Sequence, residues 1–152
     1  MKSYDVTFED WDGKKVTEKY YFHINETEWN LLNARYGGNL MHTMARLTKE
    51  RSPEEALKII LDVVKTAYGV MDDDRIHFRK ASTNPKIWED FVSSPGFDKF
   101  FIDVMSDDAK TAEFINGIMP KKLRDAARAD MENSGEASKK VIELSKADVT
   151  IT

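Results

Sequence analysis

The sequence contains no cysteine among its 152 residues. That absence excludes disulfide bonds, thiol catalysis, cysteine-ligated zinc and iron–sulfur clusters. The first residues lead into no apolar run, so we expect neither a signal peptide nor a membrane span. Basic residues are also outnumbered by acidic ones, since the chain has 23 Lys and Arg against 27 Asp and Glu, for a net charge of −4. This balance argues against nucleic acid as the main partner. Because we expect neither a signal peptide nor a membrane span, we predict a cytoplasmic protein.

The length of the chain fits one domain. Hydrophobic residues make up 41% and charged residues 33% of the sequence, which is typical of a globular protein. From Glu132 onward there is no aromatic residue, and Ser, Lys, Glu and Ala dominate. We therefore predict one domain over residues 1–128 and a flexible C-terminal tail over residues 129–152. Within that tail, Val141, Ile142 and Leu144 leave open a helix formed on a partner.

The N-terminal part predicts a β-hairpin. Apolar and polar residues alternate over residues 4–24, as a half-buried strand requires. The alternation is interrupted by Asp12-Gly13, a dipeptide that tolerates the positive φ angles of a tight turn. A two-stranded ribbon is marginal alone, so one face of the hairpin must pack against the rest of the chain.

The remaining chain shows helical spacing with recognisable caps. Asn25 and Glu28 predict a capping box, Gly37-Gly38 ends that helix, and a second short helix follows over residues 40–47. Ser52-Pro53-Glu54-Glu55 opens a further helix that Gly69 closes. Its apolar face is so wide that we predict it to be the most buried helix of the fold.

Helices also dominate the second half. Residues 72–80 are either a polar loop or a short extended piece around Ile76-His77-Phe78, and Pro85 opens a helix. Residues 93–96 predict a break, after which apolar residues recur from Phe97 to Met105. Ser106-Asp107-Asp108 caps a last helix that runs to Gly117 before Pro120. The predicted fold class is α+β: a mainly helical domain with an N-terminal β-hairpin packed on a helical bundle.

No pattern in the sequence predicts catalysis. The pairs Glu54/Glu55 and Asp107/Asp108 stand at predicted helix starts, where capping explains them. Asp72-Asp73-Asp74 does not begin an EF-hand, because the sixth and twelfth positions are His77 and Thr83 instead of glycine and glutamate. We interpret that run as a solvated loop, with His77 only weak evidence for a metal. We therefore expect no enzyme, no catalytic residue, no metal and no other cofactor.

The last predicted helix carries two adjacent apolar pairs, Phe114-Ile115 and Ile118-Met119. A short helix cannot easily bury all four inside a small domain, so core and partner-binding roles both stay open. A basic run follows, but Asp125 and Asp130 interrupt it, so a small nucleic-acid-binding regulator is the weaker alternative. The basic residues of that run are Lys121, Lys122, Arg124 and Arg128.

The run from Ala112 to Pro120, AEFINGIMP, followed by Lys121-Lys122-Leu123, resembles the signature of a tail assembly chaperone family of long-tailed bacteriophages and prophages. Residues 21–24, Gly37-Gly38 and residues 67–69 fall in the order that this family shows, as do Phe91 and Phe97. The similarity covers about residues 20–125, and the stretch after Arg128 does not align with it.

The resemblance implies a non-enzymatic protein of the bacterial host cytoplasm that is absent from the mature virion. Its implied partners are the tape measure protein, the major tail protein and a longer form of itself made by programmed frameshifting, and a homo-oligomer is also possible. We expect helix-in-groove binding of tape measure segments. The candidate partner-binding residues are Phe97, Phe101, Phe114, Ile115, Ile118, Met119, Pro120, Lys121 and Lys122.

Overall fold

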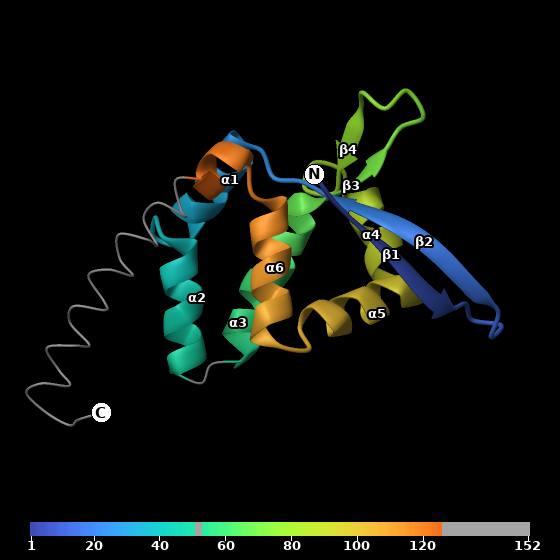
Figure 1. The fold of residues 1–152 in the computed structure, drawn as a ribbon, viewed down its shortest axis with the longest axis horizontal. Helices are drawn as coiled ribbons and strands as arrows, with labels where there is room; N and C mark the ends of the chain where they lie inside the picture. The colour runs from blue at the N-terminus through green and yellow to red at the C-terminus, as the bar shows by residue number, and fades with distance from the viewer. Residues whose placement is uncertain (51–52, 126–152) are drawn as a thin grey trace, which may run out of the picture. The chain divides into compact units, whose positions relative to one another are not determined.

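The computed structural model describes residues 1–50 and 53–125 (Figure 1). It divides the chain into a unit of residues 1–119 and a unit of residues 120–152. In the second unit, the described residues 121–125 are helical. The elements of the first unit are β1 (Lys2–Glu9), β2 (Lys15–Phe22), α1 (Glu26–Arg35), α2 (Leu40–Lys49), α3 (Pro53–Ala67), β3 (Tyr68–Met71), β4 (Phe78–Lys80), α4 (Pro85–Val92), α5 (Pro95–Val104) and α6 (Asp108–Ile118).

The strands form one antiparallel sheet in the order β1-β2-β3-β4. β1 pairs with β2 along its whole length, from Lys2 opposite Phe22 to Glu9 opposite Lys15. The carboxylate of Asp10 accepts the N–H groups of Asp12 and Lys14, both at 2.9 Å, and Gly13 adopts φ +82° between them. The predicted hairpin is therefore confirmed, and its turn is fixed by an aspartate as well as by a glycine.

One face of the hairpin packs against helices. α5 and α6 contact β1, while α4 contacts β3. Alternate residues of the hairpin are buried on this face, whereas the residues between them face outward and are mostly polar. The predicted α+β class, mainly helical with an N-terminal hairpin on the helices, is thus confirmed.

Aromatic rings fill the space between sheet and helices. Phe22 stacks on Phe100 with centroids 4.7 Å apart, and Phe114 meets Phe22 edge to face at 5.3 Å. These three rings are at most 2% exposed. Tyr68 of β3 stacks on Phe91 of α4 at 3.8 Å. Such aromatic pairs add specific geometry to the burial of apolar area, and they fix α4, α5 and α6 against the sheet.

The predicted caps of α1 are present. The Asn25 side chain accepts the N–H of Glu28 at 2.8 Å, and the Glu28 carboxylate accepts the N–H of Asn25 at 3.1 Å. α1 ends at Arg35, followed by Gly37 and Gly38 at positive φ. The predicted second short helix corresponds to α2.

The prediction for the next helix is partly wrong. α3 begins at Pro53 as predicted, although its proposed cap Ser52 lies outside the described residues. It ends at Ala67, and Tyr68 and Gly69 already belong to β3. Its first turns are exposed, with Leu57 38% exposed, whereas its second half is buried. Only the end that leads into the sheet is therefore central to the fold.

Two further boundaries differ from the prediction. The predicted break at residues 93–96 is shorter, because Ser94 caps α5 and Pro95 and Gly96 are its first residues. α6 continues through Gly117 to Ile118. Residues 72–77 form a loop, and the short strand β4 begins only at Phe78, so the predicted extended piece around residues 76–78 overlaps the strand at one residue.

Some predictions lie beyond what the structure describes. The predicted tail over residues 129–152 lies outside the described residues, as do residues 126–128 of the predicted domain. No helix among residues 1–50 and 53–125 combines the length and apolar character needed to cross a membrane.

Candidate functional site

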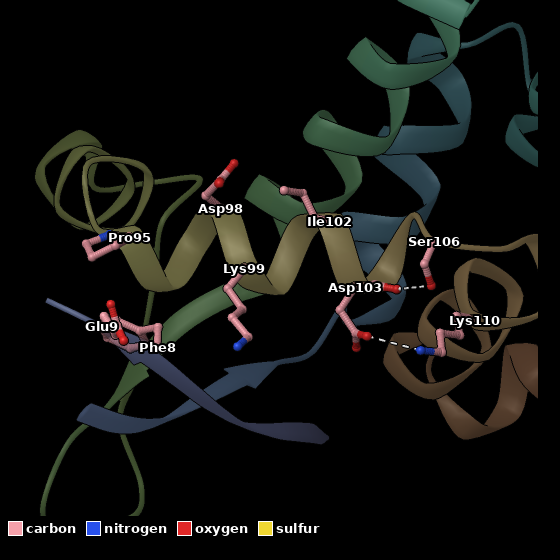
Figure 2. A pocket seen from close by; sticks show the side chains of 9 residues that line it. All are labelled: Phe8, Glu9, Pro95, Asp98, Lys99, Ile102, Asp103, Ser106 and Lys110. Carbon is pink, nitrogen blue, oxygen red and sulfur yellow. Dashed lines mark hydrogen bonds and ion pairs between the residues drawn. The ribbon is translucent and has the colours of Figure 1, made fainter. Parts of the chain in front are cut away.

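A groove lies between the end of β1 and the exposed side of α5 (Figure 2). Its volume is about 590 Å³. β1 contributes its last two residues, α5 contributes a row along its whole length, and α6 closes the far end. The lining residues are Phe8, Glu9, Pro95, Asp98, Lys99, Ile102, Asp103, Ser106 and Lys110.

α5 forms this wall because its two sides differ in character. Gly96, Phe100 and Val104 are buried against the sheet. The opposite side carries charged residues with one aliphatic side chain among them, Ile102, which is 61% exposed. An isolated exposed isoleucine is ordinary, but here it stands beside a groove whose floor includes the ring of Phe8. The groove thus offers apolar surface with charges along its rims.

The charges of the groove are only partly paired. Asp103 holds the ammonium group of Lys110 at 3.0 Å and raises the pKa of that lysine. Glu9, Asp98 and Lys99 have no ion-pair partner among the described residues. Figure 2 shows Lys99 and Asp103 projecting from α5 toward the side where the hairpin lies, and Asp98 and Ile102 projecting to the other side. A partner could therefore meet charges of both signs here.

Four predicted binding residues lie in the core instead. Phe114 and Ile118 are fully buried, Ile115 is 2% exposed and Met119 is 7% exposed. α6 can bury both apolar pairs because it lies against β1 and α5, and because the Ile118 carbonyl accepts the N–H of Ile24 at 3.0 Å. The expectation that this helix leaves apolar side chains exposed for a partner is therefore wrong. These residues stabilise the fold, and none of them lines the groove.

The other predicted residues are placed differently. Phe97 and Phe101 are half-buried, with their rings stacked at 5.7 Å, and Phe97 also meets Trp88 edge to face at 5.9 Å. They belong to the α4–α5 contact and do not line the groove. Pro120 is half-buried, while Lys121 and Lys122 are exposed. These last three belong to the unit of residues 120–152.

The acidic loop between β3 and β4 holds itself together. Asp74 accepts the N–H groups of Ile76 and His77 and contacts the His77 ring at 2.5 Å, and its pKa is lowered mainly by those two amides. Asp72 pairs with Arg79 at 2.9 Å. Asp72, Asp74 and His77 place potential ligand atoms within 4.8 Å of one another. A metal ion there would compete with these contacts, which already explain the arrangement as a closed loop.

A second polar cluster joins α1 to the sheet. The Lys80 ammonium group donates to the backbone carbonyls of His23 and Ala67, and it lies 3.3 Å from the Glu28 carboxylate. Only 14% of the Lys80 side chain is exposed, and burial lowers the pKa of this lysine. Because these polar contacts of the Lys80 ammonium group join β4 to α1, to the end of α3 and to the chain after β2, we interpret the cluster as structural.

The sequence did contain a signal for the groove. Positions 95, 98, 99, 102, 103 and 106 recur at helical spacing, and Ile102 is the only large apolar residue among them. The apolar stripe of the same helix, Phe97 to Met105, is the stronger pattern and predicts only the side that packs against the fold. The contribution of Phe8 and Glu9 depends on tertiary packing and has no local signal.

Comparison with known protein families gives a match over almost the whole chain. A family model described as phage tail assembly chaperone matches residues 1–150. No curated protein matches the chain, and no solved structure matches it. The family match covers the hairpin, every helix around the groove and the basic run at residues 121–124.

Proposed function

This chain belongs to the phage tail assembly chaperone family, and from that premise we propose that it binds the tape measure protein and helps to recruit the major tail protein before the tail is complete. The observation that carries this proposal is the family match over residues 1–150. We propose that the chaperone acts in the cytoplasm of the bacterial host, without catalysis, and is absent from the mature virion. A longer, frameshifted form of the chain and a homo-oligomer remain predicted partners.

The groove beside α5 is the surface that we propose for client binding. It combines exposed Ile102 and the floor of Phe8 with rims of both charge signs. Apolar surface of a client that has not yet assembled tends to aggregate, and covering it keeps the client available. A groove of about 590 Å³ covers a short segment only. Many copies along one long client would therefore act together, each with modest affinity.

Co-expression with the tape measure protein of the same phage or prophage tests this function. We expect the wild-type chain to raise the soluble fraction of the tape measure protein and to co-purify with it. Ile102→Asp should reduce co-purification about tenfold, since a central apolar contact typically contributes more than ~1.4 kcal/mol. Ile76→Asp is the matched control, because Ile76 is 79% exposed at the tip of the β3–β4 loop and does not line the groove.

The melting temperatures of both variants should match that of the wild type, because both side chains are exposed. If the wild-type chain leaves the solubility of the tape measure protein unchanged and does not co-purify, the proposed function is wrong. A salt-dependent gel shift with DNA or RNA that needs Lys121 and Lys122 would instead support the nucleic-acid alternative.

A further inference from the structure

The outer edge of β1 is a row of unpaired backbone groups. β1 is the end strand of the sheet. The Asp10 N–H donates to the Lys14 carbonyl at 2.8 Å, so even-numbered residues of β1 bond to β2, because hydrogen-bonded positions recur at every second residue of an antiparallel pair. Within residues 1–50 and 53–125, nothing bonds to the backbone groups on the other edge. Those groups belong to Ser3, Asp5, Thr7 and Glu9.

α5 lies over the same strand in the opposite direction. A Cβ atom built on Gly96 would lie 2.7 Å from the Phe8 ring, whereas the Phe100 ring lies 5.4 Å from that of Tyr4. The groove begins at Phe8 and Glu9 and continues beside α5 to Lys110 (Figure 2). The next strand position of the sheet, beyond β1, is therefore adjacent to the groove wall that α5 provides.

We propose that a segment of a partner chain enters this groove in extended conformation and pairs with the outer edge of β1. This inference rests on the proposed function and specifies how the client is held. Strand addition satisfies the free N–H and C=O groups of the edge, and pockets beside the edge select alternate side chains. An α-helix cannot provide these bonds, because its own backbone groups are already paired.

The charges of the edge define the chemistry of this segment. Side chains alternate between the two faces of a strand, so every second residue of the client faces the groove wall at Phe8 and Lys99, whereas Ile102 projects from α5 to the other side. The residues between them lie beside Asp5 and Glu9 on the outer face of the sheet. Glu9 has no ion pair among the described residues, and Asp5 lies 3.9 Å from Lys19. The fitting client alternates apolar residues with Lys or Arg.

Three labelled peptides separate this mode from helix binding. The first has about eight residues that alternate valine and lysine. The second contains the same residues with its valines at helical spacing, and the third replaces each lysine by glutamate. We expect fluorescence anisotropy to show binding of the first peptide at micromolar Kd, and binding at least about tenfold weaker for the other two.

Two proline substitutions locate the binding edge. Thr7 and Thr17 face each other, and their hydroxyl groups are 2.8 Å apart. Both N–H groups point away from the β1–β2 ladder, so each proline removes an outward N–H together with the same hydroxyl contact. Thr7→Pro should weaken binding of the alternating peptide about tenfold, whereas Thr17→Pro should change it less than about twofold. Thr7→Ala, which keeps the N–H, should bind like Thr17→Ala.

Amide hydrogen exchange gives a readout that does not depend on these variants. In the wild-type chain, the alternating peptide should slow exchange at Asp5, Thr7 and Glu9, whose N–H groups face the open edge. Unchanged exchange at these amides overturns the proposal, as does equal binding of the valine–lysine peptide with helical spacing. A dimer that only Thr7→Pro dissociates would assign the edge to a second copy, and would also overturn it.

The outcomes distinguish this inference from the proposed function. If capture of the tape measure protein requires Ile102 but is unaffected by Thr7→Pro, the function stands and strand addition is wrong. If the wild-type chain does not capture the tape measure protein at all, the proposed function itself fails.

Discussion

Gly96→Ala tests the close contact between α5 and the hairpin on which the groove depends. A Cβ atom at this position would lie 1.9 Å from the Tyr20 hydroxyl and 2.7 Å from the Phe8 ring. Both distances are far below van der Waals contact, so α5 or the two rings must move. Alanine is favoured over glycine in a helix by up to ~1 kcal/mol, whereas overpacking costs about 1–3 kcal/mol. Gly96 is in the first turn of α5, where the propensity gain is small, so we expect a net loss of about 1–2 kcal/mol.

Urea unfolding of four variants measures this effect with its controls. Gly117→Ala is the matched control, because its Cβ atom would meet only the flexible Lys2 side chain, with 2.9 Å to Cδ. It should therefore be neutral or stabilise by up to ~1 kcal/mol. Tyr20→Phe should be nearly neutral, because the buried hydroxyl has no hydrogen-bond partner among the described residues. In the Tyr20→Phe background, Gly96→Ala should cost less, with a coupling energy of at least about 0.5 kcal/mol.

A stabilising effect of Gly96→Ala would contradict the close packing of α5 on the hairpin. If Gly96→Ala stabilises the protein as much as Gly117→Ala does, helix propensity decides the outcome and α5 is not in close contact with Tyr20. The wall of the groove would then lie elsewhere, and the assignment of the site would lose its basis.

Three further changes test other parts of the fold. Lys80→Met should lower the free energy of unfolding by about 3 kcal/mol in urea titrations, because it leaves the half-buried Glu28 carboxylate and two backbone carbonyls unpaired. A loss below ~1 kcal/mol would contradict the structural role of the Lys80 contacts. Asn25→Ala should cost about 1 kcal/mol by removing the capping box, and a neutral result would mean that α1 does not depend on it. Burial raises the pKa values of Tyr20 and Tyr68 to about 12, so the folded state keeps protons that the unfolded state loses above pH ~10. These two groups should leave the free energy of unfolding unchanged below that pH and should lower it by about 5 kcal/mol by pH ~12. Urea unfolding measures this loss, and tyrosinate absorbance measures the deprotonation. A free energy of unfolding that stays constant over this pH range would contradict the burial of the two side chains.

The features predictable from sequence were those fixed by short stretches of chain. The hairpin follows from alternation around Asp12-Gly13, and α1 follows from the pair Asn25 and Glu28, because turns and caps form between neighbouring residues. The end of α3 was mispredicted, since Tyr68 has helical spacing but pairs with Phe22 in the sheet. Tertiary pairing there overrides a local pattern.

The site could not be predicted for the same reason. Whether Phe114 and Ile118 are core or surface depends on where α6 lies relative to β1, which their own spacing does not encode. The groove joins Glu9 with Lys110 across a hundred residues of sequence, and only the packing of α5 and α6 on the hairpin brings them together. The outward row of α5 was visible in the sequence, but its importance depends on what lies beside it.

Hydrogen–deuterium exchange of the chain, alone and co-purified with the tape measure protein, shows whether β1 and α5 form the client-binding surface. We expect slower exchange in the complex over β1 and α5, residues 2–9 and 95–104, with the β3–β4 loop unchanged. Protection confined to other segments, or no difference between free and bound chaperone, would contradict it.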